Sequence, residues 1–368
     1  MDHQMLVQES AKAPDSLKSR LQKLAFEKCI PLSVTIEITL KCNLRCLHCY
    51  NFDRTEPYPK ERVHEELNPP EVLALIDDVA KAGCMSLSFT GGEALVHPHL
   101  NDYVQRARSK GMIVNLKSNG ALLTAAKAQA LAKSGLASAN VSIYGGSPET
   151  HDPFTLVKGS FERTMQGIRA LQDAGIFVRI TFCLMKQNAH EVETIRALSE
   201  EMGVGILFDP QLTKRYDGTD SSLDYRLDRE TLRKLYQGPL QDLVPAPRQN
   251  PQASLQCSCA RSVCAVTSEG IVYPCIAAPI PSGNIREQSF EEIWKTSPQF
   301  QKIRGLTLED FHTCKLCPKR QYCARSSGVH YANTGDYTGP EEWSCMQAEV
   351  YQEHHQQQGT ALPPLENK

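Results

Sequence analysis

From residue 33 to residue 210, short apolar runs alternate with longer amphipathic segments. The short runs are rich in β-branched and aromatic residues, which is typical of buried strands, and the longer segments repeat apolar positions every three or four residues, which is typical of helices. The predicted strands are residues 33–39, 85–90, 112–118, 138–145, 177–184 and 205–210. The predicted helices are residues 69–83, 97–111, 124–135, 159–175 and 188–203.

The ends of these helices carry their own signals. Asn68 stands before two prolines and Gly83 follows the same helix, which is the usual order of start and stop signals. Thr124 is placed to cap the helix that it precedes. Asn188, with Glu191 three positions later, predicts a capping box.

Strands and helices in strict alternation imply a parallel sheet with right-handed crossovers, so the fold class is α/β. Either a partial barrel or an open, doubly wound sheet satisfies this order. Periodicity alone does not choose between them.

The pattern changes on both sides of this α/β region. Leu17, Leu21 and Leu24 predict a helix that packs against it from the N-terminal side, and His354 and His355 are expected on the surface of a solvated tail. The expected organisation is an N-terminal helical extension (1–32), an α/β domain (33–211), a linker or helical bridge (212–256), a cysteine-rich domain (257–350) and a disordered tail (351–368).

Composition narrows the function. The chain has 368 residues, 14 cysteines and a formal net charge of -2. Balanced charge argues against nucleic acid or an anionic membrane as the main partner. No apolar run approaches the roughly 20 residues of a membrane span, and the N-terminus does not resemble a secretory signal. We therefore expect a cytoplasmic protein, in which clustered cysteines indicate metal sites more often than disulfides.

The densest cluster, "CNLRCLHC", holds Cys42, Cys46 and Cys49 directly after the first predicted strand. Loops in this position form the active face of parallel α/β folds. Three thiolates on one loop suit a zinc ion with an open position, or a four-iron cubane with one iron left free for an outside ligand. The cubane fits better.

This C-x3-C-x2-C loop resembles that of the radical S-adenosylmethionine (SAM) enzymes, in which SAM chelates the open iron through its amino and carboxylate groups. The resemblance implies a partial (β/α)6 barrel, a [4Fe–4S] cluster and bound SAM. It also implies reductive cleavage of SAM to a 5′-deoxyadenosyl radical that abstracts a hydrogen atom. An outside electron donor such as flavodoxin or ferredoxin is then required.

Three further segments match that family in order. "TGGEA" resembles the motif that binds the SAM amino group, with Ala94 in place of the usual proline, "KSNG" stands where the family contacts the ribose, and "SIYGG" ends the fourth strand. His48, before the third cysteine, is expected against the adenine. The cofactor-binding residues implied are His48, Gly91, Gly92, Glu93, Ser118, Asn119 and Ser142.

A second cysteine region follows residue 256. "CKLCPKRQYC" holds Cys314, Cys317 and Cys323, and Cys345 lies further on. Zinc is the first interpretation of such knuckles. Upstream are four more thiols, with a hairpin turn predicted at "EG" before the last of them: Cys257, Cys259, Cys264 and Cys275.

The region resembles the SPASM extension of radical SAM enzymes, which carries auxiliary [4Fe–4S] clusters. The resemblance implies one cluster on Cys314, Cys317, Cys323 and Cys345. The cysteine that would complete the other cluster is replaced here by Ser327. Three interpretations stay open: Cys259 substitutes for the missing cysteine, or one iron is open to water, Ser327 or substrate, or the cluster is absent. We favour a cluster on Cys257, Cys264 and Cys275, with Cys259 as the fourth ligand.

The sequence carries fewer signals for the substrate than for the cofactors. "HDPFTLVKGSF" and "NIREQSFEEIW" resemble the branch of SPASM enzymes that modifies ribosomally made peptides, so a peptide or protein substrate is expected. The alternatives are a sulfatase-maturing enzyme, a haem or tetrapyrrole-pathway enzyme, and a non-catalytic zinc-binding scaffold. Asp209 is a candidate proton acceptor and Cys183 a candidate hydrogen donor, but each also has a purely structural interpretation, so no catalytic residue is assigned.

Overall fold

A computed structural model describes residues 16–56, 65–248 and 255–363 of the chain. Its centre is a sheet in the order β6-β5-β4-β3-β2-β1-β7-β8. The first six strands are parallel, as the alternation predicted. They are β1 (Ser33–Glu37), β2 (Ser86–Thr90), β3 (Ile113–Ser118), β4 (Ser138–Ile143), β5 (Phe177–Cys183) and β6 (Gly205–Asp209).

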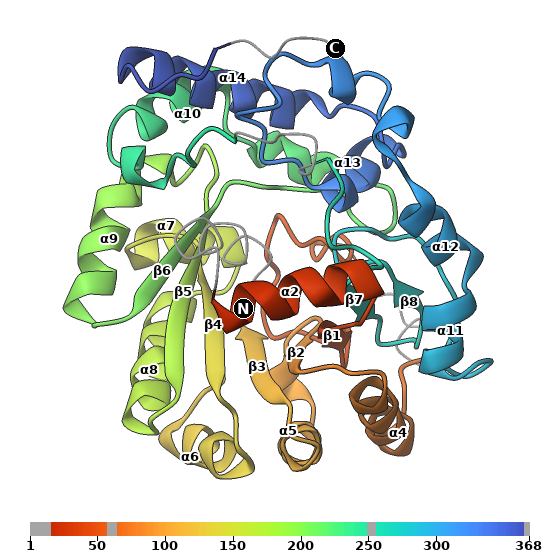
Figure 1. Cartoon of the computed structure of the whole chain (residues 1–368). Coiled ribbons are helices and arrows are strands. Elements are labelled where there is room, and N and C mark those ends of the chain that lie inside the picture. Colours follow the sequence, from red (N-terminus) through yellow and green to blue (C-terminus); the bar gives the residue numbers. More distant parts are fainter. Residues whose placement is uncertain (1–15, 57–64, 249–254, 364–368) are drawn as a thin grey trace.

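Helices cover one face of this sheet (Figure 1). They are α4 (Pro69–Lys81), α5 (Leu100–Ser109), α6 (Ala125–Ser134), α7 (Pro148–Thr155), α8 (Ser160–Asp173) and α9 (Val192–Glu201). Val34, Leu87 and Val141 point toward the helices and are fully buried. Thr35, Ser88 and Ser142 lie on the opposite face and line a cavity. One apolar outer face and one polar inner face identify a partial barrel and exclude the doubly wound alternative, in which helices cover both faces.

The predicted helix signals are largely confirmed. Asn68 and Glu71 form a capping box at α4, and Thr124 caps α6 through the backbone N–H of Lys127. The capping box predicted at Asn188 is wrong. The Asn188 amide instead donates to the carbonyls of Tyr144 and Cys183, so it ties β4 to β5 while α9 begins at Val192.

The N-terminal helix forms as predicted, but its leucine stripe does not pack. In α2 (Leu17–Lys28) Leu17 is 72% exposed and Leu24 46% exposed. The buried position is Ala25, and neighbouring Phe26 lies against the guanidinium of Arg261. The helix thus buries only a narrow face, and small Ala25 allows the closest approach.

The cysteine-rich region is continuous with the barrel sheet. Strand β7 (Val263–Val266) pairs in parallel with β1, and β8 (Val272–Tyr273) pairs antiparallel with β7. Gly270 makes the predicted hairpin turn with φ +85°. The domain boundary expected at residue 257 is therefore crossed by a single sheet, which aligns the two cysteine regions rigidly.

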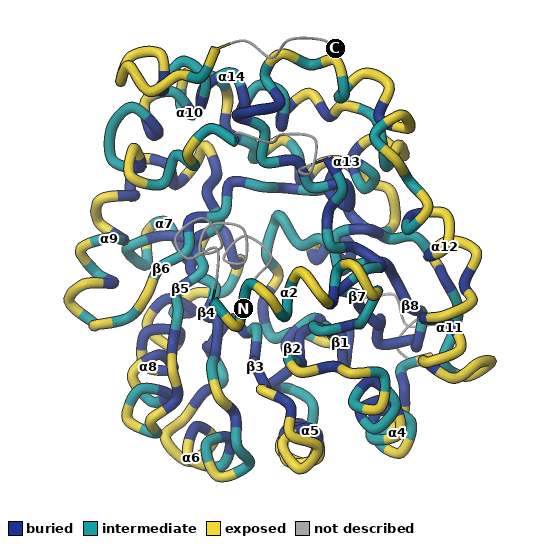
Figure 2. The backbone as a smooth tube through the Cα atoms, in the orientation of Figure 1, coloured by how far each residue is buried: buried dark blue, intermediate teal, exposed yellow. Residues whose placement is uncertain are grey.

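The remaining helices are α10 (Arg229–Tyr236), α11 (Phe290–Thr296), α12 (Pro298–Gly305), α13 (Ser327–Thr334) and α14 (Glu342–Gln357). Of these, α10, α13 and α14 lie over one end of the barrel, and α11 and α12 lie along the sheet edge beside β8 (Figure 1). Figure 2 shows that these helices carry both buried and exposed residues, as expected of helices that cover a core. Within the described part of the chain, no helix is long and apolar enough to cross a lipid bilayer.

The disordered tail expected from residue 351 is wrong as far as residue 357, because α14 continues to Gln357. His354 and His355, expected on the surface, are only 8% and 6% exposed. His355 hydrogen-bonds with the Pro245 carbonyl at 3.0 Å and packs against Tyr322. These contacts come from distant segments, so the polar composition of the tail did not reveal them. Residues 364–368 lie outside the described residues.

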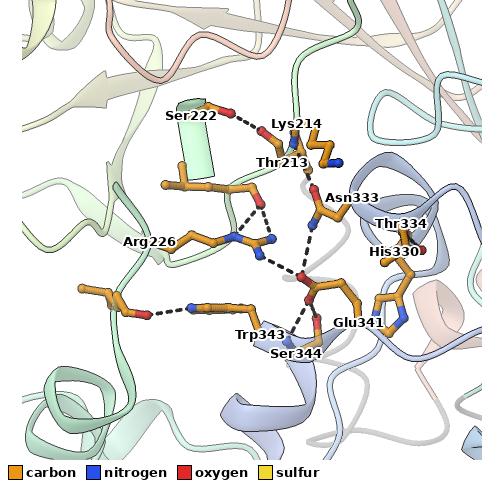
Figure 3. Close-up of polar contacts among 12 residues, drawn as sticks. Thr213, Lys214, Ser222, Arg226, His330, Asn333, Thr334, Glu341, Trp343 and Ser344 are labelled. Atoms are coloured by element: carbon orange, nitrogen blue, oxygen red, sulfur yellow. Dashed lines mark hydrogen bonds and ion pairs between the residues drawn. The ribbon is translucent and has the colours of Figure 1, made fainter. Parts of the chain in front are cut away.

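The segment after β6 is braced against the C-terminal region (Figure 3). Arg226 pairs with the buried carboxylate of Glu341 at 2.8 Å. The backbone N–H of Lys214 donates to Asn333, and the Trp343 indole donates to the Leu227 carbonyl. The predicted linker is thus a fixed bridge over residues 212–248.

Candidate active site

The loop of Cys42, Cys46 and Cys49 lies at the carboxyl end of β1. Its backbone is held by α7, where the carbonyls of Thr155 and Phe154 accept hydrogen bonds from Arg45 and Leu47. The three side chains are partly buried and interact with one another electrostatically. A short loop with no helix or strand of its own can turn three thiols toward one point.

Arg54 completes this loop and was not singled out in the sequence. Its Nε lies 3.2 Å from the Cys49 sulfur and its Nη1 donates to the Leu40 carbonyl at 2.9 Å. Burial raises the pKa of Cys42 to about 11, against the opposing effect of Arg54. Thiols so crowded are stable as thiolates only when cations bind them. The donor set therefore fits an iron–sulfur cluster with a buried guanidinium beside it.

The "GGEA" segment approaches the cysteine loop more closely than a side chain would permit. A Cβ on Gly91 would lie 2.3 Å from the Thr39 carbonyl oxygen, and Gly91 has φ +128°. A Cβ on Gly92 would lie 2.3 Å from the Lys41 oxygen. Glycine is required at both positions. The segment after β2 can therefore lie directly against the backbone that leads from β1 into the cysteine loop.

Glu93 is fully enclosed at 1% exposure. Its carboxylate accepts hydrogen bonds from Leu95 N at 3.0 Å, Ser118 Oγ at 2.8 Å and Asn119 N at 2.7 Å. A carboxylate has about four acceptor sites, so one site is left for an ammonium group. Burial raises the pKa of Glu93 in spite of these donors, and a bound cation would lower it again.

Ser118 and Asn119 follow β3 and are engaged by the protein itself. The Ser118 hydroxyl donates to Glu93 and accepts from Gly120 N. The Asn119 side chain donates to Asn43 Oδ1 at 2.9 Å and lies 3.9 Å from the Cys42 sulfur. The structure thus joins the predicted ribose segment to the cysteine loop.

His48 sits in an aromatic pocket. Its ring centroid is 4.8 Å from that of Tyr144 and 4.9 Å from that of Phe154. Burial lowers the pKa of His48 to about 4, so the ring is neutral. Its buried Nδ1 has no hydrogen-bond partner among the described residues. An aromatic cluster with one unsatisfied nitrogen fits contact with a planar heterocycle such as adenine.

A cavity of about 400 Å³ lies on the inner face of the barrel sheet and reaches the C-terminal region. Ser142 and Asp209 line it from the barrel, and Cys275, Arg248 and Arg325 line it from the other side. Asp209 also accepts a hydrogen bond from Gln211 N at 3.0 Å, which is its structural interpretation, and its role as a proton acceptor stays a prediction. Cys183 lies beside Asp209 and Cys46.

The later cysteines form two groups. Cys314, Cys317, Cys323 and Cys345 interact mutually, and Arg325 donates to the Cys314 sulfur at 3.3 Å. This is the set that the sequence predicted for one auxiliary cluster.

The other group is Cys257, Cys259 and Cys275, in which the Cys259 thiol interacts with the thiols of both Cys257 and Cys275. Tyr337 lies 3.2 Å from the Cys257 sulfur. Cys264, in β7, pairs with Val34 of β1 and is buried in the apolar core near Cys84, but it also interacts with Cys275 and is among the residues that line the cavity. Because Cys259 interacts with both Cys257 and Cys275, the geometry favours Cys259 as a ligand more directly than Cys264. Alternation along a strand turned Cys264 to the outer face, which cysteine spacing alone did not show.

Ser327 is completely buried, and its hydroxyl has no partner among the described residues. The next residue, Gly328, lies so close that an added Cβ would be 2.8 Å from the Cys275 sulfur. Ser327 therefore begins α13 beside the group that lacks its usual fourth cysteine.

A SAM-cleaving iron–sulfur enzyme is the class of protein that this barrel, cysteine loop and glycine segment define. Comparison with known sequences agrees, and the chain belongs to the radical SAM superfamily. The profile described as "Radical SAM superfamily" matches residues 36–198, and the SPASM profile, described as "Iron-sulfur cluster-binding domain", matches residues 257–319. The enzyme accordingly uses SAM, a [4Fe–4S] cluster and auxiliary iron–sulfur clusters, and the zinc-scaffold alternative is excluded.

Among relatives, the "AdoMet-dependent heme synthase" of Methanosarcina barkeri is 31% identical over 340 residues, which cover 85% of this chain and 96% of the relative. The "Fe-coproporphyrin III synthase" of the same organism is 29% identical over 317 residues, covering 76% and 77%. The "PqqA peptide cyclase" of Rhizobium meliloti is 30% identical over 310 residues, covering 79% and 80%.

Solved structures show the same fold. The AdoMet-bound anSMEcpe structure superposes with TM-score 0.68 at 16% identity, covering 89% of this chain and 94% of the other. Streptococcus suis SuiB bound to its precursor peptide SuiA superposes with TM-score 0.62 at 15% identity, covering 83% and 74%.

Proposed function

We propose that this enzyme abstracts a hydrogen atom from a carboxylate-bearing tetrapyrrole of the haem pathway. The cavity inside the barrel, which Cys275 lines, carries the proposal, because it combines polar barrel residues with Lys117, Arg248 and Arg325. Its volume lies in the range usual for ligand pockets. The haem-synthase relative, aligned over nearly its full length, supports the same substrate class.

The chain's own groups have distinct tasks. Glu93 holds the amino group of SAM, and His48 with Tyr144 and Phe154 encloses its adenine. When bound and reduced, the cluster supplies the electron that cleaves SAM to methionine and a 5′-deoxyadenosyl radical. The partial barrel shields that radical from water on the side of the sheet.

Arg248 is the residue best placed to hold a substrate carboxylate. Burial lowers the pKa of its guanidinium, and the charge that opposes this effect is that of Cys323. A buried cation gains more than an exposed one from an anionic ligand, and the planar guanidinium suits a carboxylate. Arg325, by contrast, is already bound to the carbonyls of Tyr337 and Gly339.

A ribosomally made peptide is the second candidate substrate, as expected from the sequence. The peptide-cyclase relative and the peptide-bound structures of neighbours with this fold favour it. The motif "HDPFTLVKGSF" no longer adds support, because its residues have a structural task. The Asp152 carboxylate accepts from Gly159, Ser160 and Phe161 and so fixes the start of α8.

Anaerobic turnover separates the two candidates. The reconstituted enzyme is incubated with SAM, a one-electron reductant, and either iron-coproporphyrin or a set of precursor peptides. We expect 5′-deoxyadenosine and a mass change in the porphyrin. Deuterium at the porphyrin side chains should appear in 5′-deoxyadenosine. A modified peptide together with an unchanged porphyrin overturns the proposal.

Porphyrin affinity, followed by absorbance titration, gives an independent test. We expect Arg248→Gln to weaken binding by roughly ten- to a hundred-fold, as for loss of a charged hydrogen bond. Arg163→Gln is the matched control, because Arg163 is exposed, its guanidinium hydrogen-bonds the Lys158 carbonyl, and it does not line the cavity.

A further inference from the structure

Three tyrosine rings lie in a row between the two cysteine regions. Tyr50 directly follows Cys49, and its ring centroid is 5.3 Å from that of Tyr216. The Tyr216 centroid is 5.7 Å from that of Tyr273, which precedes Cys275 by two residues. Both pairs meet edge to face. The row thus begins at the SAM-cluster loop and ends at the group around Cys275.

Hydrogen bonds fix the middle ring at both ends. The backbone N–H of Tyr216 donates to the Tyr50 carbonyl at 2.9 Å, and its hydroxyl donates to the carbonyl of Ile276, next to Cys275. Arg215 adds a hydrogen bond to the Leu47 carbonyl at 3.0 Å and an ion pair with Asp53. The loop that carries Tyr216 is therefore clamped onto the cysteine loop.

The sheet adds a second rigid connection. Tyr273 belongs to β8, and β7 joins β8 to β1, the strand that leads into the cysteine loop. Figure 1 shows these three strands side by side. Glu37, at the end of β1, accepts a hydrogen bond from the Tyr50 hydroxyl at 2.8 Å. Each ring is thus held by backbone that cannot move independently.

We propose that Tyr50, Tyr216 and Tyr273 form an aromatic bridge that couples one-electron transfer between the SAM-binding cluster and the cluster held around Cys275. The bridge rests on both cysteine groups holding clusters, but not on the identity of the substrate. Tunnelling is faster through a contiguous π-system than across aliphatic side chains or gaps. An oxidised phenol is much less stable than an oxidised cluster, so the rings act as a medium and are not themselves oxidised.

The transfer is balanced without further reactants. With both clusters bound, one electron would leave the cluster at Cys275, which would be oxidised, and would reach the SAM-binding cluster, which would be reduced. The phenols keep their protons, and no bond forms or breaks. The route allows an electron released by the substrate radical to be returned for another SAM cleavage.

The test measures electron transfer in the holoenzyme without substrate. S-adenosylhomocysteine, which binds without being reductively cleaved, gives the SAM-binding cluster a distinct electron paramagnetic resonance signal. A light pulse on a soluble flavin reductant adds one electron per chain, and freeze-quenched samples follow its redistribution. Iron content and both cluster potentials are measured for every variant, so that a slower rate is not due to a lost cluster or a changed driving force.

We expect Tyr216→Leu to slow redistribution several-fold and Tyr216→Phe, which keeps the ring, to match the wild type. Tyr331→Leu is the control, because Tyr331 is a partly buried tyrosine of α13 outside the row. Tyr273→Leu tests the second junction if Tyr216→Leu fails to load its clusters. Wild-type rates in the leucine variants overturn the bridge, and so does a phenylalanine variant as slow as the leucine one.

Discussion

The Nε of Arg54 lies 3.2 Å from the sulfur of Cys49, inside the loop that holds the SAM-binding cluster. Arg54 is only 7% exposed and also lies over the ring of Phe52 at 4.2 Å. A buried positive charge against a ligand sulfur favours the cluster's reduced, more negative state. Arg54 is therefore expected to set the ease with which the enzyme accepts its electron.

Replacing Arg54 by Met should lower the reduction potential of this cluster. Loss of a charged hydrogen bond worth about 1.5–3 kcal/mol corresponds to a shift on the order of 65–130 mV for one electron. Redox titration monitored by electron paramagnetic resonance measures it. Arg54→Lys keeps the charge but not the planar fork, so its potential should lie between the two. If the cluster has the same reduction potential in the Arg54→Met variant and in the wild type, Arg54 only supports the loop.

Changing Cys42, Cys46 and Cys49 together to Ala should abolish formation of 5′-deoxyadenosine and leave iron bound at the C-terminal cysteines. The reason is spatial, because the C-terminal groups take no ligand from this loop. Iron analysis and chromatography of anaerobic reactions check both parts. Undiminished SAM cleavage would overturn the assignment of the loop.

Glu93→Gln should weaken SAM binding by roughly ten- to a hundred-fold, because a neutral amide accepts more weakly from an ammonium. The amide also places an N–H against donors such as Asn119 N, so thermal stability should fall as well. Equilibrium dialysis with labelled SAM measures affinity. Ser118→Ala removes one donor to Glu93 but no charge, and should weaken binding less. If Glu93→Gln binds SAM as tightly as the wild type does, the SAM ammonium group is bound by another residue.

Alanine variants of Cys259 and Cys264 together test which cysteine holds the first auxiliary cluster. Cys259→Ala should lower iron content and alter the resonance spectrum, since Cys259 contacts Cys257 and Cys275. Cys264→Ala should leave both unchanged, because Cys264 lies in the apolar core. The opposite result would restore Cys264 as the ligand. If neither variant changes the iron, Ser327 or an open iron becomes the favoured interpretation.

Asp152 predicts a pH effect on stability. Although burial opposes it, hydrogen bonds from Phe161, Ser160 and Gly159 hold the pKa of Asp152 below its usual value. A carboxylate whose pKa is lowered in the folded state stabilises the fold at pH values above the pKa of the unfolded state, which is about 3.9. This stabilisation is lost as the pH falls through the lower pKa of the folded state. Asp152→Asn should cost about 1 kcal/mol near pH 7, as for a lost helix cap.

Urea unfolding of wild type and Asp152→Asn between pH 7 and the acid limit of the fold tests this expectation. The difference between the two proteins should shrink as the pH falls. Glu162→Gln is the control, because Glu162 is exposed on the same helix, α8. A difference that stays constant with pH would mean that Asp152 acts through packing alone.

The sequence by itself determined the six parallel strands and the cysteine loop. Strand and helix periods are local properties of the chain, and cysteines three and four positions apart need no distant partner to form a site. The same holds for Gly91 and Gly92, which mark a close backbone approach. Radical SAM chemistry and the SPASM extension were therefore within reach of the sequence.

Only the tertiary structure decided which groups meet across the fold. It joined β7 to β1, turned Cys264 into the core and brought Cys259 to Cys257 and Cys275. It also brought the Arg54 guanidinium against the Cys49 thiol and placed Tyr216 between the two cysteine regions. These relationships depend on which face of a strand a residue occupies and on loops far apart in the chain. Such contacts form only when the sheet and its helices are packed, so no local pattern records them.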